Sequence, residues 1–161
     1  MPQHSFPIEH EKSVSYRQMQ VLSPAFNENE PIPAKYTCDG ANINPALHID
    51  HIPEEAGSLA IIVDDPDAPR GTWVHWVIWN VPVTHHLAEN YSRGIQGSND
   101  SGDRGYDGPC PPSGTHRYFF KVYALDGNLE LSPNADKADL EKAMAGHIIG
   151  FGELVGLYKK K

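Results

Sequence analysis

Three runs of the sequence are apolar at almost every position and rich in β-branched and aromatic residues: 58–63, 73–81 and 116–125. Such runs are typical of β-strands, and their near-continuous hydrophobicity predicts burial on both faces. Residues 148–157 form a similar run and predict a last strand. Residues 134–146 contain mostly good helix formers and end at a glycine, which predicts one helix. Short strands with one firm helix favour a mainly β sandwich with a peripheral helix.

Length and composition indicate a single domain. The chain has 161 residues and contains no internal repeat and no linker long enough to separate domains. Residues 1–17 are mostly polar and lack the apolar stretch of a signal peptide, so we expect a flexible N-terminal extension before one domain over 18–161. No run approaches the roughly 18 consecutive apolar residues of a membrane helix. These features predict a cytoplasmic protein that is not integral to a membrane.

The charge balance argues against one class of partner. Thirteen basic and 21 acidic residues give a formal net charge of −8 at pH 7, which opposes non-specific binding to nucleic acid or to an anionic membrane surface. We therefore expect no nucleic-acid partner. Any anionic ligand must be held by local donors.

An acidic turn, Asp-Pro-Asp-Ala-Pro at 65–69, follows the first apolar run. Proline cannot donate to a sheet ladder, so Pro66 and Pro69 end the strand and leave Asp65 and Asp67 at its mouth. The prolines also stiffen the turn, which fixes the direction of the carboxylates. A rigid acidic turn can orient imidazoles, accept N–H groups of a ligand or hold a metal ion. The alternative is an Asx turn in which the carboxylates only cap the local backbone.

His75 lies inside the second apolar run. Strict alternation along a strand places it on one face with Trp73, Val77 and Trp79. A lone histidine among tryptophans is either a core residue with satisfied hydrogen bonds or part of a site. The short connection over 70–72 returns the chain beside the strand that it has just left, so a hydrogen bond from Asp to His is geometrically easy.

A loop rich in proline and glycine, 108–114, leads into the third apolar run. Its glycines allow the backbone to approach a ligand closely and to expose N–H groups as an anion nest. Alternation places His116 and Tyr118 on one face of the following strand and Arg117 on the other. An aromatic edge strand after a hairpin turn would explain the loop, but not why His116 and Tyr118 both lie at its mouth.

In combination, residues 65–69, 73–76 and 108–118 closely resemble the phosphatidylethanolamine-binding protein family, also known for Raf kinase inhibitor protein, and in particular its bacterial and archaeal branch. Supporting stretches lie at 31–33, 36–42, 105–108 and 146–148. The resemblance implies a sandwich of antiparallel Greek-key β-sheets with one or two peripheral helices. It also implies a small cavity for phosphate- or carboxylate-type headgroups. The residues implied as its lining are Asp65, Ala68, Pro69, His75, Gly108, His116 and Tyr118.

The hydrogen-bonding capacity of these residues suggests their roles. His75 and His116 can donate ring N–H groups, Tyr118 its hydroxyl and Gly108 its backbone N–H to the oxygens of an anion. Asp65 can orient an imidazole or accept a ligand ammonium group.

The resemblance implies a binding protein whose ligand is a small anion of phosphate, phosphoethanolamine or carboxylate type. It also implies a rim that contacts a protein kinase or protease, and a homodimeric assembly. No counterpart is expected for the C-terminal helix that partly closes the cavity in the animal proteins, because the sequence ends soon after 148–157. We expect no cofactor.

Two other kinds of site are compatible with the same residues. One is a hydrolase or lyase in which Asp65 orients His75 or His116 as a general base. The sequence has neither a Gly-x-Ser-x-Gly elbow nor a His-Glu-x-x-His motif, so we expect no enzymatic activity. The other is a divalent metal site made by the aspartates and histidines. Tyr118 and the glycine-bearing loop fit an anion better than a metal ion.

Cys38 and Cys110 are the two cysteines of the chain, and Cys110 lies in the loop that precedes His116. They are either two free thiols in a reducing cytoplasm or a reversible disulfide. A disulfide would tie the pocket loop to an N-terminal loop and make ligand access redox-sensitive.

Two histidine motifs lie outside these segments. Residues 48–51 contain two histidines between flanking prolines, which predicts a loop. Residues 85–86 are a His-His pair shortly after a proline, which predicts a surface turn.

Overall fold

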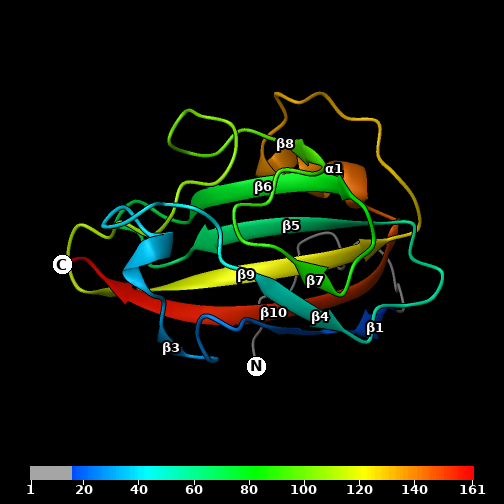
Figure 1. Ribbon diagram of the computed structural model, residues 1–161. Helices are drawn as coiled ribbons and strands as arrows, with labels where there is room; N and C mark the ends of the chain where they lie inside the picture. Colours follow the sequence, from blue (N-terminus) through cyan, green and yellow to red (C-terminus); the bar gives the residue numbers. More distant parts are fainter. Residues whose placement is uncertain (1–15) are drawn as a thin grey trace.

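The computed structural model describes residues 16–161 (Figure 1). They fold into two β-sheets, one α-helix and a short 3-10 helix, Ala34–Tyr36, joined by loops. The larger sheet has seven strands, of which β3 (Glu30–Pro31) pairs only with β10. The other six follow the spatial order β1 (Arg17–Gln18), β10 (Ile148–Lys159), β9 (Thr115–Leu125), β5 (Ser58–Asp65), β6 (Trp73–Val81) and β8 (Ile95–Gln96). The smaller sheet consists of β2 (Gln20–Leu22), β4 (Leu47–Asp50) and β7 (His86–Leu87).

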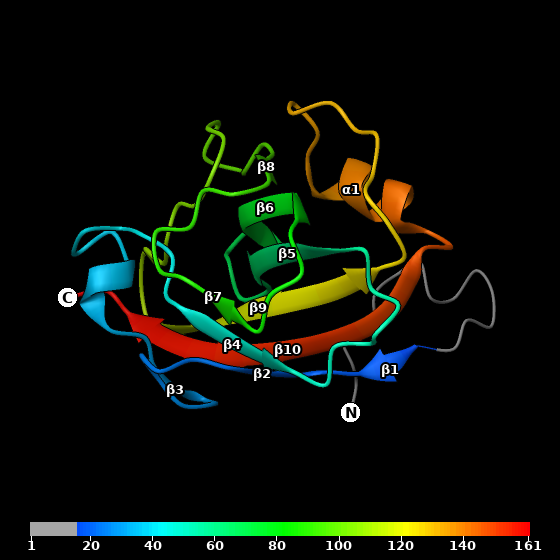
Figure 2. The same ribbon diagram turned by 45° about the vertical axis from the view of Figure 1, so that its right-hand side comes forward.

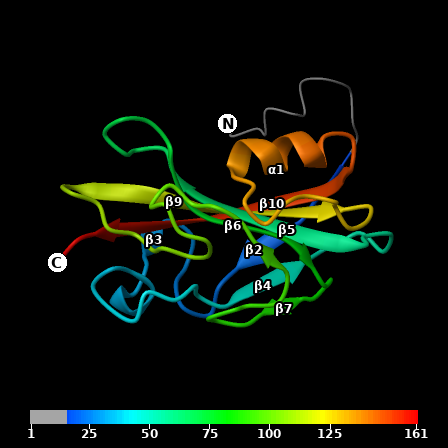
Figure 3. The ribbon, with the colours of Figure 1, turned by 90° about the horizontal axis from the view of Figure 1, so that it is seen from above.

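The larger sheet separates the remaining elements into two layers (Figures 2 and 3). Helix α1 (Lys137–Met144) covers one face, and the smaller sheet covers the other. Leu140 of α1 packs in one core with Ile62, and Ile49 of the smaller sheet packs in a second core with Trp76. All eight residues of β5 are therefore buried. The predicted mainly β, two-sheet architecture is confirmed, as is burial of this strand on both faces.

The helix is shorter than the predicted 134–146 because its N-cap is Asp136. The Asp136 side chain accepts a hydrogen bond from the Asp139 backbone N–H at 3.0 Å, and the Asp139 carboxylate accepts one from the Asp136 N–H at 3.2 Å. This reciprocal capping box satisfies N–H groups that the first turn of a helix leaves free.

Two short strands depart from the antiparallel arrangement that the resemblance implies. β1 and β3 each pair with β10 in parallel. With two residues each, they are too short for a periodic pattern to reveal them. The predicted extension over 1–17 lies outside the described residues except for Tyr16 and Arg17, and Arg17 begins β1. Within 16–161, no helix is long and apolar enough to cross a membrane.

A bulge near the start of β6 sets the direction of its side chains. Val63 of β5 lies opposite Trp76, and the next residue, Asp64, lies opposite Val74. His75 is therefore an extra residue on β6 with no partner on β5, which is the definition of a bulge. A bulge breaks the strict alternation of side chains between the two faces of a sheet, and this one occurs at the edge of the candidate site.

Candidate functional site

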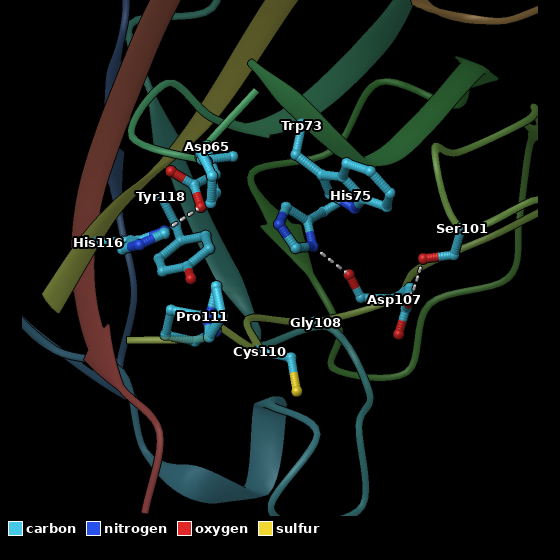
Figure 4. Close-up of a pocket in the computed structure, with 13 residues that line it drawn as sticks. Asp65, Trp73, His75, Ser101, Asp107, Gly108, Cys110, Pro111, His116 and Tyr118 are labelled. Atoms are coloured by element: carbon cyan, nitrogen blue, oxygen red, sulfur yellow. Dashed lines mark hydrogen bonds and ion pairs between the residues drawn. The ribbon is translucent and has the colours of Figure 1, made fainter. Parts of the chain in front are cut away.

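The residues implied by the family resemblance line one cavity of about 310 Å³ (Figure 4). Because β5 runs antiparallel to both β6 and β9, the end of β5 meets the beginnings of its two neighbours, and the cavity lies there. The loop over 107–112 completes its wall. All seven predicted residues contribute to the lining, namely Asp65, Ala68, Pro69, His75, Gly108, His116 and Tyr118.

Asp65 and His116 form a buried pair in this cavity. The Asp65 Oδ2 atom accepts a hydrogen bond from His116 Nδ1 at 2.6 Å, and the two residues are 3% and 6% exposed. The other carboxylate oxygen of Asp65, Oδ1, accepts the backbone N–H of Asp67 at 2.7 Å. Asp65 thus forms the Asx turn that was the alternative interpretation and also orients an imidazole. Each of its oxygens already accepts one hydrogen bond.

Asp67 points away from the cavity and binds Arg117. Its two oxygens accept hydrogen bonds from the Arg117 guanidinium at 2.8 and 2.9 Å, and Oδ2 also accepts the Arg117 backbone N–H. The hydrogen bond from the Arg117 side chain is the main reason why the pKa of Asp67 is lowered. This pair ties the acidic turn to β9 and leaves Arg117 outside the site, on the face that alternation predicts.

The bulge turns His75 into the cavity. Its ring contacts the ring of Tyr118 edge-on, with 5.3 Å between the centroids, on the same face of the larger sheet as Trp76. Strict alternation predicts the opposite face, shared with Val77 and Trp79, which pack instead in the core under α1. That prediction is wrong because the extra residue shifts the phase of β6 by one position.

Burial favours the neutral form of the His75 imidazole. It lowers the pKa of His75 below the usual 6.5, and the hydrogen bond to the Asp107 backbone opposes this shift only in part. That bond joins His75 Nδ1 to the Asp107 carbonyl oxygen at 2.6 Å. A carbonyl can only accept, so Nδ1 carries the proton and Nε2 is an acceptor. The neutral ring therefore has no free N–H for an anion, contrary to the prediction. It gains one only when Nε2 takes up a proton.

Tyr118 presents a hydroxyl group with no well-formed hydrogen bond to the described residues. The residue is fully buried, and its hydroxyl forms no hydrogen bond of normal geometry within residues 16–161, although the Asp65 carboxylate lies close enough to interact with it. Burial, followed by the negative charge of Asp65, raises the pKa of Tyr118, so the hydroxyl keeps its proton. Figure 4 shows the ring between Asp65, His75 and His116 at the cavity wall. A buried hydroxyl left unpaired costs about 1–3 kcal/mol, which a hydrogen bond to a ligand oxygen would offset.

Gly108 lines the cavity but does not supply the predicted donor. Its backbone N–H donates to Asn42 Oδ1 at 2.8 Å. A Cβ atom at this position would collide with the carbonyl oxygen of Tyr36, so the close packing of the two loops requires glycine. The prediction of an anion-binding N–H at Gly108 is wrong because Asn42 already accepts it.

Comparison with known proteins decides the family. The family model described as phosphatidylethanolamine-binding protein matches residues 22–159, a range that contains every residue lining the cavity. The chain belongs to the phosphatidylethanolamine-binding protein (PEBP) family.

Relatives of this PEBP family member occur in archaea and bacteria. The UPF0098 protein of Pyrococcus abyssi is 53% identical over 89% of this chain and 87% of its own length. That of Methanothermobacter thermautotrophicus is 52% identical over 88% of this chain and 99% of its own length. A crystal structure of a PEBP homologue from Chlamydia trachomatis has a TM-score of 0.86 at 44% identity, covering 90% of this chain and 99% of that one. Escherichia coli YbcL, introduced as a new member of the mammalian PEBP family, has a TM-score of 0.81 at 30% identity, covering 89% and 99%.

Six further residues line the PEBP cavity. Cys110, Pro111 and Pro112 lie in the loop that the sequence placed at the site, whereas Trp73, Ser101 and Asp107 were not predicted. Among these six, Asp107 is the residue that forms a hydrogen bond with His75. Besides binding His75 through its carbonyl, its carboxylate accepts hydrogen bonds from Asn42 at 3.1 Å and from the Ser101 hydroxyl. Its place beside Gly108 is a signal in the sequence, but its contact with His75 depends on the bulge.

A disulfide joins Cys38 to Cys110 across 72 residues of sequence. Cys110 lines the cavity, and the Cys38 backbone N–H donates to the Pro109 carbonyl at 3.1 Å. The disulfide therefore fastens the 107–112 loop to the loop that contains Asn42. Of the two alternatives left open by the sequence, the structure describes the oxidised one.

The cavity, which is lined by described residues, lacks the cluster of ligands that a metal site would need. Over residues 16–161, no group of three or more His, Cys, Asp or Glu side chains is arranged to hold a metal ion. Two of the candidate ligands, the Asp65 and His116 side chains, form a hydrogen bond with each other.

Proposed function

We propose that this PEBP family member binds a small anionic headgroup, of phosphate or carboxylate type, in the cavity and releases it unchanged. The Tyr118 hydroxyl carries this proposal, because it is a buried donor at the cavity wall without a hydrogen bond of normal geometry in the described chain. His116 adds a second donor when both its ring nitrogens are protonated, since the Asp65 carboxylate then lies 2.6 Å from the positive ring.

The neutral state of His75 narrows the choice of ligand. Nε2 of His75 is an acceptor, so a ligand that carries both an anionic oxygen and a proton fits the cavity better than a fully ionised one. The monoanion of a phosphate monoester meets this requirement, and so does phosphoethanolamine through its ammonium group. A fully ionised anion requires that His75 take up a proton on binding.

The rim of the cavity offers a surface for a protein partner. Trp73 lines the cavity and is 42% exposed, which is unusual for a tryptophan. A phosphorylated side chain in the cavity would place its own protein against Trp73. A kinase or a protease is the class of partner that the family resemblance implies.

The disulfide makes this binding sensitive to redox conditions. Reduction would release Cys110, and with it the loop that forms part of the cavity wall. A reducing cytoplasm would favour the two free thiols, and a more oxidising environment would favour the disulfide. The oxidised and the reduced protein would then differ in their affinity for the anion. The cytoplasmic location and the homodimer stay predictions from the sequence.

Calorimetric titration of the purified protein with phosphate, phosphoethanolamine and acetate tests the proposal. We expect saturable binding of at least one of these anions, and a loss of about tenfold or more in His116→Ala, because a hydrogen bond to a charged group contributes about 1.5–3 kcal/mol. Absence of binding by all three would refute the anion site.

One observation favours a second candidate, a hydrolase or lyase. The Asp65–His116 pair has the geometry of a general base held by a carboxylate. Assays with phosphate and carboxylate esters distinguish the two functions. Turnover that vanishes in His116→Ala would support the enzyme, whereas saturable binding without turnover would support the binding protein.

A further inference from the structure

Two histidines far from the cavity face each other across the smaller sheet. His48 in β4 and His86 in β7 are direct cross-strand partners, and Figure 3 shows these two strands side by side. The two Nδ1 atoms are 3.2 Å apart, whereas the ring centroids are 4.6 Å apart, so the nitrogens are turned toward each other. The sequence predicted a loop around His48 and a surface turn at His86. The first prediction is wrong, because residues 47–50 form β4. Of the second pair, His85 does lie in an exposed bend, whereas His86 is part of β7.

Asp50 fixes the proton on the His48 ring. Its Oδ1 atom lies 3.1 Å from His48 Nε2. A carboxylate only accepts hydrogen bonds, so Nε2 carries the proton and Nδ1 of the neutral ring presents a lone pair toward His86. Histidine ligands of metal ions almost always have this arrangement, with the outer nitrogen donating to a carboxylate or a carbonyl.

The surroundings hold His86 in position and leave the pair accessible. The Thr84 hydroxyl accepts the His86 backbone N–H at 3.2 Å and donates to the His86 carbonyl at 3.0 Å. His85 is engaged elsewhere, with its Nδ1 atom 2.9 Å from the Ile49 carbonyl. Both His48 and His86 line a surface groove, which gives water and ions access to the two nitrogens.

We infer that His48 and His86 bind a divalent transition metal ion through their Nδ1 atoms, with Asp50 as the carboxylate behind His48. In the free protein His86 Nδ1 donates a hydrogen bond to His48 Nδ1, and on metal binding this proton moves to His86 Nε2. Two ligand atoms about 2.0–2.1 Å from a zinc ion, at the tetrahedral angle, lie about 3.3–3.4 Å apart. The observed 3.2 Å therefore needs little movement. Since no third metal-ligating side chain joins the pair among residues 16–161, water molecules complete the coordination.

The chemistry of the pair predicts which ion binds best. Imidazole nitrogens suit copper, nickel and zinc, and affinity for divalent ions at such sites generally peaks at copper. We expect Cu²⁺ to bind more tightly than Ni²⁺ or Zn²⁺. The oxygen-preferring ions Mg²⁺ and Ca²⁺ should not compete.

Calorimetric titration of the untagged full chain with Cu²⁺, Ni²⁺ and Zn²⁺ tests this site. We expect one Cu²⁺ site whose affinity falls more than tenfold in His48→Ala and in His86→Ala. The loss in Asp50→Asn should be about 10–100-fold, the usual effect of removing such an outer carboxylate. The control is His147→Ala, because His147 is also exposed and also pairs with one aspartate, Asp126. The Cu²⁺ affinity of this variant should equal that of the wild type.

Nitrogen NMR of the imidazole rings provides a readout that does not depend on affinity alone. Binding of Zn²⁺, which unlike Cu²⁺ is diamagnetic, should shift the Nδ1 resonances of His48 and His86 and spare those of His75 and His116. Two outcomes would overturn the inference. One is Cu²⁺ affinity that is the same in His48→Ala, His86→Ala and the wild type, and the other is a wild-type protein that binds none of the three ions.

Discussion

The Nδ1 atom of His116 lies 2.6 Å from Oδ2 of Asp65, although the two residues are 51 positions apart in the sequence. The strand pairing of β5 with β9 brings them together, and burial of both side chains keeps water from competing for the bond. Nε2 is then the ring nitrogen that His116 has available for a ligand in the cavity. Asp65 supplies the counter charge when this ring becomes an imidazolium.

Replacing Asp65 with asparagine should weaken anion binding while preserving the shape of the cavity. We expect phosphate affinity to fall about tenfold or more in Asp65→Asn. The variant weakens the charged hydrogen bond between Asp65 and His116, of about 1.5–3 kcal/mol, which supports the positive His116 ring that donates to the anion. Asp67→Asn is the matched control, because it also removes one negative charge from the turn but binds Arg117 outside the cavity. Equal losses of affinity in the two variants, measured by calorimetry, would contradict the role of Asp65.

Anion binding should weaken as the pH rises from about 6 to 8. His75 has a lowered pKa in the free protein, and a bound anion favours its protonated form, so binding takes up a proton. The affinity should fall by up to about tenfold per pH unit. Sulfate is the suitable probe because it does not titrate in this range, and calorimetry in buffers of different ionisation enthalpy measures the proton uptake. A flat profile with no uptake would rule this coupling out.

The same pKa shift predicts how stability depends on pH. His75 is harder to protonate in the folded protein than in the unfolded chain, where its pKa is near 6.5. Its contribution to the free energy of unfolding is therefore fully present above about pH 6.5 and is lost as the pH falls through the lowered folded-state value. In His75→Asn, which keeps a donor for the Asp107 carbonyl, this part of the pH dependence should disappear. Denaturant unfolding of both proteins between pH 5 and 8 tests it.

Reduction of the disulfide should weaken both the fold and the site. A disulfide that closes a long loop contributes about 2–4 kcal/mol to the free energy of unfolding. Phosphate affinity should also fall, because Cys110 holds part of the cavity wall. The double variant Cys38→Ser/Cys110→Ser should match the reduced protein and respond no further to dithiothreitol. If titrations of the oxidised and reduced protein give the same affinity, the redox part of the account is wrong.

The sequence predicts the long strands well because continuous apolar runs are local signals, whereas the residues of the cavity lining came from the family resemblance. Continuous apolar runs mark β5, β6 and β9, and prolines mark the end of β5 at Asp65. The bulge at His75 could not be predicted, since it depends on which residues of β5 lie opposite β6. The pairing of His48 with His86 has the same origin, as it arises only from the register of two short strands.

The roles of individual donors were harder to predict than their positions. Gly108 is in the cavity wall, but its N–H is taken by Asn42, a residue 66 positions away. His75 is in the cavity wall, but the Asp107 carbonyl decides which of its nitrogens carries the proton. In both cases a long-range contact changes the chemistry of a correctly placed residue.

Tyr118→Phe tests the central claim most directly, because it removes only the hydroxyl that lacks a hydrogen bond of normal geometry in the described chain. Phosphate titrations of the wild type and the variant should be paired with denaturant unfolding of both proteins. The account predicts saturable binding by the wild type and an affinity about three- to tenfold lower in Tyr118→Phe, the usual contribution of one hydrogen bond. The free energy of unfolding should be unchanged, or higher by up to about 1 kcal/mol, since no bond in the unliganded protein is broken. Equal affinity in the two proteins, or a variant that is less stable but binds as tightly, would contradict the account.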